Sequence, residues 1–160
     1  METRNKVRSV AYDLDVAKIT VVGVPDHPGI AASIFVALAK AGISVDTIVQ
    51  NASINKITDL TFTVTRDQMP EALKVMKPVA KKIGAKDIVS DAKLGKVSIV
   101  GTGMQNTPGF AAKMFATLSE NNVNIELITT SEIRITCIVD EAKVKDAVRA
   151  LHQAFEVELG

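Results

Sequence analysis

The chain contains an internal repeat, and this repeat limits the folds available to it more than any other feature. The stretch from Lys18, KITVVGVPDHPGIAASIFVALAKAGISVDTIVQN, aligns with the stretch from Lys96, KVSIVGTGMQNTPGFAAKMFATLSENNVNIELITTS, after a two-residue insertion in the second loop. The recurring residues are Pro28, Gly29, Ala31, Ala32, Phe35, Leu38 and Ile48, which match Pro108, Gly109, Ala111, Ala112, Phe115, Leu118 and Ile128. A constant offset over so many positions indicates a duplication, so both copies should build the same unit.

Each copy predicts the order strand, helix, strand, strand, helix, strand. In the first copy we expect strands over 19–24, 43–50, 58–65 and 86–90 and helices over 28–41 and 67–83. In the second we expect strands over 97–101, 123–130, 133–139 and 155–159 and helices over 108–121 and 141–153. Within the 67–83 helix, Asp67 should be the cap, Pro78 should cause a kink and Gly84 should be the stop.

This order predicts an α+β fold of two ferredoxin-like βαββαβ domains, with antiparallel sheets and the helices on one face. The first domain should span residues 17–92 and the second residues 93–160. An N-terminal strand over 7–15 is left over from this pattern. It should pair with one of the sheets, because an open strand edge is a liability.

Composition excludes several classes of function. The 19 basic and 18 acidic residues nearly cancel, and 4% aromatic residues without tryptophan offer few platforms for base stacking, so we expect no nucleic-acid binding. The longest apolar run, 30–39, is about half the roughly 20 residues that span a bilayer. The charged start MetGluThrArgAsnLys lacks an apolar signal region, so we expect a cytoplasmic protein.

No residue set suits catalysis or a metal ion. Cys137 is the only cysteine, which excludes disulfide and zinc frameworks, and its strand-like surroundings predict a buried apolar side chain. Gly101 and Gly103 lack the third glycine of a nucleotide fingerprint. His27 and His152 have no nucleophile or ligand partner at a useful spacing, and His27 is expected in solvent. We therefore expect no catalytic residue, no metal and no cofactor.

The loop over 25–30 has two interpretations. It can be an ordinary connection from strand to helix, or it can bind a free amino acid. For binding, the unpaired amides of Gly29, Ile30 and Ala31 at the positive end of the helix could hold a carboxylate. Asp26 could hold the ammonium, and the small residues let a ligand approach the main chain.

These residues resemble those of a known family. VPDHPG at 24–29, SVDTIVQN at 44–51 and NVNIELITTS at 122–131 are similar to the ACT-domain regulatory region of aspartokinase, the first enzyme of lysine, threonine and methionine synthesis. The resemblance covers the chain from about Val10 to Phe155. A kinase catalytic domain, which needs about 250 residues, is absent. The chain therefore resembles the regulatory β subunit of heteromeric aspartokinases, or a regulatory fragment of a longer form.

The resemblance implies a homodimer in which the first ACT unit of one chain meets the second unit of the other, with effector amino acids at the seam. It also implies that the N-terminal strand packs into the second sheet. The implied effector site consists of Asp26, Gly29, Ile30, Ala31 and Gln50 of one chain and Asn124 and Ile125 of its partner. A second site is implied at Thr107, Gly109, Phe110, Ala111, Ser131 and Glu132, although Asn106 and Thr107 replace the aspartate there.

The function implied is that of a non-catalytic subunit that binds threonine, alone or with lysine, and transmits feedback inhibition to a catalytic aspartokinase subunit. Two alternatives stay open. One is a free-standing amino-acid sensor that regulates another enzyme or a transcription factor. The other is an enzyme on the same scaffold, which would require an acid–base pair that the sequence does not show.

Overall fold

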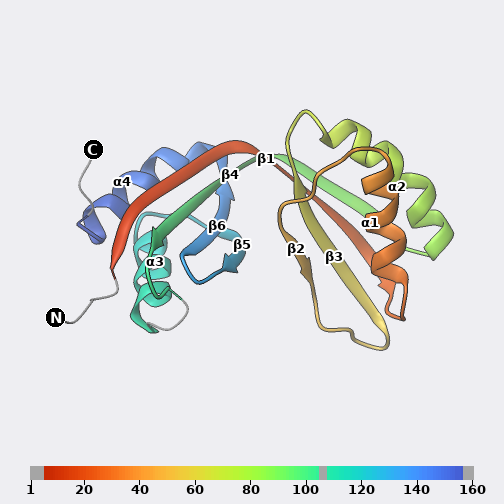
Figure 1. The fold of residues 1–160 in the computed structure, drawn as a ribbon, viewed down its shortest axis with the longest axis horizontal. Helices are drawn as coiled ribbons and strands as arrows, with labels where there is room; N and C mark the ends of the chain where they lie inside the picture. Colours follow the sequence, from red (N-terminus) through yellow and green to blue (C-terminus); the bar gives the residue numbers. More distant parts are fainter. Residues whose placement is uncertain (1–5, 105–107, 157–160) are drawn as a thin grey trace. The chain divides into compact units, whose positions relative to one another are not determined.

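The computed structural model describes residues 6–104 and 108–156 (Figure 1). The elements are β1 (Val7–Pro25), α1 (Ile30–Lys40), β2 (Ile48–Gln50), β3 (Ile57–Val64), α2 (Met69–Ile83), β4 (Asp87–Gly101), α3 (Pro108–Glu120), β5 (Ile125–Thr130), β6 (Arg134–Asp140), the 3₁₀ helix η1 (Glu141–Lys143) and α4 (Val144–Ala154). They form two compact units. The first unit comprises Asp15–Ala92, and the second comprises the described residues on either side of that range. No helix among the described residues is long and apolar enough to cross a membrane.

The first unit has the predicted βαββαβ order. Its hydrogen-bonded strands follow the order β2-β3-β1-β4. β3 lies between β1 and β2 and runs antiparallel to both. The predicted α+β class and antiparallel sheet are therefore confirmed.

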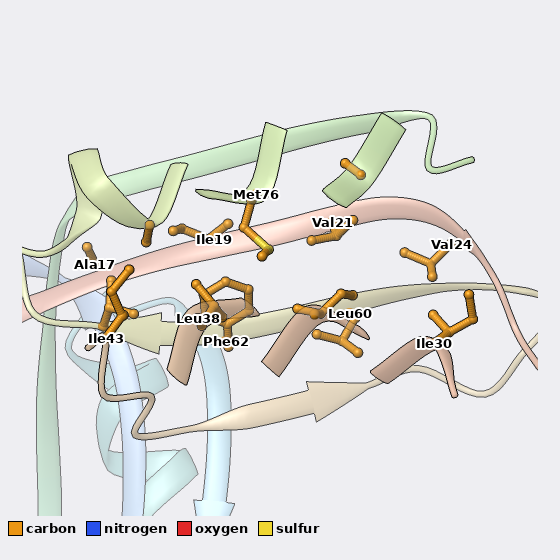
Figure 2. Close-up of a cluster of buried hydrophobic side chains, with 14 residues drawn as sticks. Ala17, Ile19, Val21, Val24, Ile30, Leu38, Ile43, Leu60, Phe62 and Met76 are labelled. Atoms are coloured by element: carbon orange, nitrogen blue, oxygen red, sulfur yellow. The ribbon is translucent and has the colours of Figure 1, made fainter. Parts of the chain in front are cut away.

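Both helices of the first unit cover the same face of its sheet. The buried side chains are Ile30, Ile34 and Leu38 of α1 and Ala72, Met76 and Ala80 of α2. They meet the inward side chains of β1 and β3 in one apolar cluster (Figure 2). Phe62 of β3 is fully buried in it, and its ring lies edge-on to the half-buried Phe35, with the centroids 5.7 Å apart. Burial of this apolar surface is the main source of the unit's stability.

The second unit has the same arrangement of strands and helices, except that a part of β1 takes the place of the predicted last strand. Its order is β5-β6-β4-β1, so the N-terminal part of β1 lies beside β4. Val7 and Val10 of this part pack into the second core. The predicted strand over 155–159 is wrong for Phe155 and Glu156, which form a turn after α4; residues 157–160 lie outside the described residues. The Phe155 ring instead packs on Phe110, with the centroids 6.4 Å apart.

Two pairs of predicted strands are in fact single strands. The segments over 7–15 and 19–24 form one strand, β1, and those over 86–90 and 97–101 form one strand, β4. Gly95 does not interrupt β4, because its φ is not positive and its missing side chain leaves room for Val144. Conversely, the strand expected over 43–50 shrinks to β2, since the Thr47 amide bonds to the Thr63 hydroxyl instead of a ladder carbonyl.

Several helix ends differ from prediction. The cap of α2 is Gln68 and not Asp67, because the chain forms a turn over 66–68 before Met69. The Gln68 side chain does not cap the helix but accepts from the Ser44 amide at 3.3 Å. α2 continues through Pro78 and ends as predicted at Gly84, whose φ of 79° is left-handed. In the helix expected over 141–153, the first turn is the 3₁₀ helix η1, capped by Asp140, whose carboxylate accepts from the Ala142 amide at 2.8 Å.

Replacing the largest buried side chain should test this account of the core. Phe62→Ala should lower the free energy of unfolding by about 3–5 kcal/mol, because it removes apolar contacts and leaves a cavity. Phe35→Ala should cost less, since Phe35 is only half-buried. Urea unfolding measures both. The control is Val36→Ala on the exposed side of α1, which should change stability by no more than about 0.5 kcal/mol. Equal losses for Phe62→Ala and Val36→Ala would contradict the assignment of the core.

Candidate functional site

A pocket of about 370 Å³ lies in the first unit, where β1 leads into α1. Its lining residues are Val24, Asp26, His27, Pro28, Gly29, Ile30, Ala31, Gln50, Thr58 and Leu60. The structure thus brings together Asp26, Gly29, Ile30, Ala31 and Gln50, which the sequence had singled out. Its floor consists of core residues, since Val24, Ile30 and Leu60 also belong to the apolar cluster.

The turn before α1 forms part of the wall of this pocket. The sequence predicted that α1 begins at Pro28, but it begins at Ile30. The reason is that Gly29 is the cap and has a left-handed φ of 93°. No heavy atom lies within 4 Å of where a Gly29 side chain would start, so the wall is open to a ligand. The Ser33 amide and hydroxyl both bond to the Gly29 carbonyl at 3.0 Å, which closes the first turn.

The amides at this helix start can receive an anion. The first N–H groups of a helix have no carbonyl partner within it and lie at the positive end of its dipole. The Ile30 amide already donates to the His27 carbonyl at 3.3 Å. The amides of Gly29 and Ala31 are therefore the ones best placed to hold a carboxylate.

Asp26 is held in place by the end of β2 and by the connection that follows it. Its amide donates to the Lys56 carbonyl at 2.8 Å, and its carboxylate accepts from the Gln50 side-chain amide at 3.3 Å. The side chain is exposed. A fixed, exposed carboxylate in the same pocket as the helix start can hold a cation, so the pocket offers binding partners for both charges of a zwitterion.

Three of the lining residues were missed by sequence reasoning. Val24, Thr58 and Leu60 enter the pocket because β1 and β3 pair with Val24 opposite Thr58. The alternation of β3 puts Thr58 and Leu60 on one face, but only the strand pairing shows that this face meets α1. His27 is exposed as predicted, with Nδ1 3.2 Å from the Pro28 carbonyl.

The two residues expected from a partner chain lie elsewhere in this chain. Asn124 and Ile125 belong to the second unit, where they line a separate pocket of about 410 Å³. The rest of its lining consists of Phe115, Ser119, Asn122 and Val123. Asn124 and Ile125 are therefore not among the residues that line the pocket at Asp26.

The described residues of the second implied site lie at two places in the second unit. Gly109, Phe110 and Ala111 lie at the start of α3, and Phe110 packs on Phe155. Ser131 and Glu132 lie in the turn after β5, where the Ser131 amide bonds to Arg134 and the Glu132 carbonyl accepts from Met104. Thr107 lies outside the described residues.

The described residues contain no cluster of histidine, cysteine and acidic side chains that could hold a metal ion. Cys137 is fully buried in β6, as predicted. Burial raises the pKa of its thiol to about 12, because a thiolate would lose its hydration there. At neutral pH this thiol is protonated and unsuited to nucleophilic chemistry.

Comparison with known proteins identifies the fold. Residues 19–78 and 97–155 each match the ACT domain family. The chain is also 45% identical to the regulatory subunit of aspartate kinase from Thermus thermophilus, with a TM-score of 0.89, over 93% of this chain and 98% of that one. This chain belongs to the aspartokinase regulatory family of tandem ACT domains.

Other members of this family are equally similar. A chain in the structure of aspartokinase alpha and beta subunits shares 43% identity, with a TM-score of 0.88, over 94% of this chain and 99% of that one. The aspartate kinase of Pseudomonas fluorescens is 45% identical over 152 residues, which are 95% of this chain and 37% of the relative. The ACT chain thus spans well under half of such full-length relatives. The resemblance inferred from the sequence is confirmed.

The high pKa of Cys137 leads to a labelling test. A thiol-directed reagent such as 5,5′-dithiobis(2-nitrobenzoate) should not react with the folded protein at pH 8, which lies far below the thiol pKa of about 12. In concentrated urea the thiol should react at once, because unfolding restores an ordinary pKa near 8.5. Absorbance at 412 nm follows the reaction. Rapid labelling of the folded chain would contradict the burial of Cys137.

Proposed function

We propose that this ACT chain is a non-catalytic regulatory subunit that binds an effector amino acid in the pocket at Asp26 and mediates feedback inhibition of a catalytic aspartokinase subunit. The observation that carries the proposal is the pairing, in one pocket, of an exposed carboxylate with the amides of a helix start. Asp26 takes the α-ammonium, and the Gly29 and Ala31 amides take the α-carboxylate.

The proposed effector is threonine, which suits this pocket better than lysine does. Its methyl group can contact the apolar floor of Val24 and Leu60, and its hydroxyl can bond to the Gln50 amide. Lysine, the second effector that the resemblance suggests, would need a further carboxylate for its side-chain ammonium. Asp26 is the only acidic residue in the pocket lining within the described chain, so lysine would need a contact from outside this pocket.

The two edge strands of the sheet order support pairing of two chains. β2 and β5 are the terminal strands of the sheet order, and their equivalent residues Ile48 and Ile128 are 53% and 45% exposed. Exposed isoleucines on a strand edge favour contact with another chain. In the proposed dimer, the first unit of one chain meets the second unit of the other, and Asn124 and Ile125 of the partner chain close the pocket. The second implied site, at Gly109 to Ala111, is a weaker candidate because no aspartate corresponds to Asp26.

The relatives support a catalytic partner. One related structure contains aspartokinase alpha and beta subunits, and the full-length aspartate kinases are more than twice as long as the matched region. We accordingly propose that the chain acts in the cytoplasm with a kinase subunit. The alternative is an amino-acid sensor for another enzyme or a transcription factor. Adding threonine to a reconstituted mixture with a catalytic aspartokinase subunit distinguishes the two, since only the proposed partner would yield threonine-sensitive phosphorylation of aspartate.

Removing the Asp26 carboxylate should abolish most of the affinity for threonine. Asp26→Ala should weaken binding about tenfold to a hundredfold, because a hydrogen bond to a charged group contributes about 1.5–3 kcal/mol. Calorimetry measures the affinity. The matched control is Asp67→Ala, which removes the same charge from an exposed turn outside the pocket and should leave binding unchanged.

Thermal unfolding supplies a second measurement for the same variants. Threonine at a hundredfold excess over its Kd should stabilise the unmodified chain by about 2.7 kcal/mol, since it binds only the folded form. Asp26→Ala should lose this shift but keep the melting temperature of the ligand-free chain. Threonine binding by Asp26→Ala as tight as in the unmodified chain would mean that the loop is an ordinary connection.

The exposed edge isoleucines lead to a prediction about assembly. The unmodified chain should be a dimer by light scattering, and Ile48→Asp should shift it to the monomer, because it puts a charge into the proposed apolar seam. Ile54→Asp, in the connection after β2 and 76% exposed, is the control and should leave the dimer intact. A monomeric unmodified chain in the presence of threonine would refute the proposed dimer.

A further inference from the structure

The strand that leads to the pocket is interrupted by a bulge at Gly23. β1 and β3 pair regularly up to Val21 and Leu60, and the next pair is Val24 and Thr58. Two residues of β1 therefore face only one residue of β3, namely Asp59. Gly23 adopts a left-handed φ of 66°, which costs an ordinary side chain far more than glycine.

The carboxylate of Asp59 provides the hydrogen bond that this bulge would otherwise lose. Its Oδ1 accepts from the Gly23 amide at 2.9 Å. Gly23 is buried, and the Lys86 side chain covers it so closely that an added Cβ would lie 2.7 Å from Lys86 Cγ. A buried backbone amide without a partner is costly, so the side chain of Asp59 compensates for the missing ladder carbonyl.

The bulge decides which side chains reach the pocket. In a regular strand Val21 and Gly23 would share one face, and Val24 would point to the other. The extra residue instead puts Val24 on the face of Val21, and both are fully buried in the cluster of Figure 2. Val24 is part of the pocket floor, and Asp26 follows two residues later in the lining. A shift of one residue would turn this floor residue away from the core.

The second repeat has no such bulge, and no carboxylate bonded to it, at the equivalent position. Gly101 corresponds to Gly23, and its amide donates to the Ile133 carbonyl at 2.8 Å, as in a regular ladder. The residue equivalent to Asp59 is Arg134, which pairs with Val100 without a register shift. The repeats otherwise match, since the hydroxyl pair Thr20–Thr61 at 2.9 Å recurs as Ser98–Thr136 at 2.7 Å.

We propose that Asp59 is a positioning residue for the effector site, and that its hydrogen bond to Gly23 makes the first repeat, and not the second, the one with a competent pocket. Asp59 acts through the bulge and is not among the residues that line the pocket. The inference rests on the proposed function, because it explains where the effector binds. It also makes a claim about the ligand-free chain, which can be tested separately.

The experiment compares Asp59→Ala with Asp59→Asn in the 160-residue chain. Asn keeps a side-chain oxygen for the Gly23 amide, whereas Ala removes it. Asp59→Ala should weaken threonine binding by about tenfold, the size expected for one hydrogen bond to a charged group, and Asp59→Asn should stay within about threefold. The control is Thr61→Val, on the same strand as Asp59. It loses the hydroxyl bond to Thr20 of β1 and should retain full affinity.

A readout on the ligand-free chain separates positioning from general stability. Hydrogen exchange of the Gly23 amide, followed by NMR, should become at least about tenfold faster in Asp59→Ala, but should not change in Asp59→Asn or Thr61→Val. Unchanged Gly23 exchange or unchanged threonine affinity in Asp59→Ala would overturn the inference. So would an equal loss in Asp59→Asn, since the charge and not the hydrogen bond would then matter.

Two further outcomes are also decisive. If Asp59→Ala fails to fold, Asp59→Glu replaces it. Glu moves the acceptor by one methylene and should raise both Gly23 exchange and the threonine Kd, and no change in either would refute the inference. If the unmodified chain binds no threonine, the proposed function fails, while Gly23 exchange still shows whether Asp59 holds the bulge.

Discussion

Each unit of this protein depends on covering one face of its sheet with two helices, because an apolar sheet face left in water would not stay folded. In the first unit this requirement brings α1 and α2 over β1 and β3, with Phe62 fully buried between them. The pocket follows from the same packing. Its floor of Val24, Ile30 and Leu60 is the rim of the core, so a ligand there contacts residues that are already rigidly packed.

The polar part of the pocket depends on hydrogen bonds between the loop before α1 and the connection around β2 and β3. Asp59 holds Gly23, the Lys56 carbonyl holds the Asp26 amide, and Gln50 holds the Asp26 carboxylate. In the proposed site, these bonds would orient the polar groups before a ligand arrives, which lowers the entropy cost of binding. They also connect the pocket to β2, the edge strand with the exposed Ile48. An effector can regulate assembly only if it binds one arrangement of the chains better than another, and this connection offers a physical route for such a preference.

Duplication produced two units with the same core and different loops. The hydroxyl pairs and the helix stripes recur, because they are part of the packing that each unit needs. The bulge at Gly23 does not recur at Gly101, where the ladder stays regular. The second unit also takes its fourth strand from the N-terminal part of β1, so divergence is greatest at the sheet edges and loops. Sites for ligands and partners are expected in these places.

The sequence by itself determined the repeat, the order of strands and helices, the helix stripes and the loop that carries Asp26, because these features follow from periodicity and local turn chemistry. Its error at Asp67 came from a local turn over 66–68, after which α2 starts, and its error at Phe155 came from a strand signal that the packing of Phe155 on Phe110 overrode. Only the tertiary structure decided that Thr58 and Leu60 complete the pocket and that Asp59 holds Gly23, 36 residues away in the sequence. Strand pairing creates these contacts, and no short stretch of sequence contains both partners.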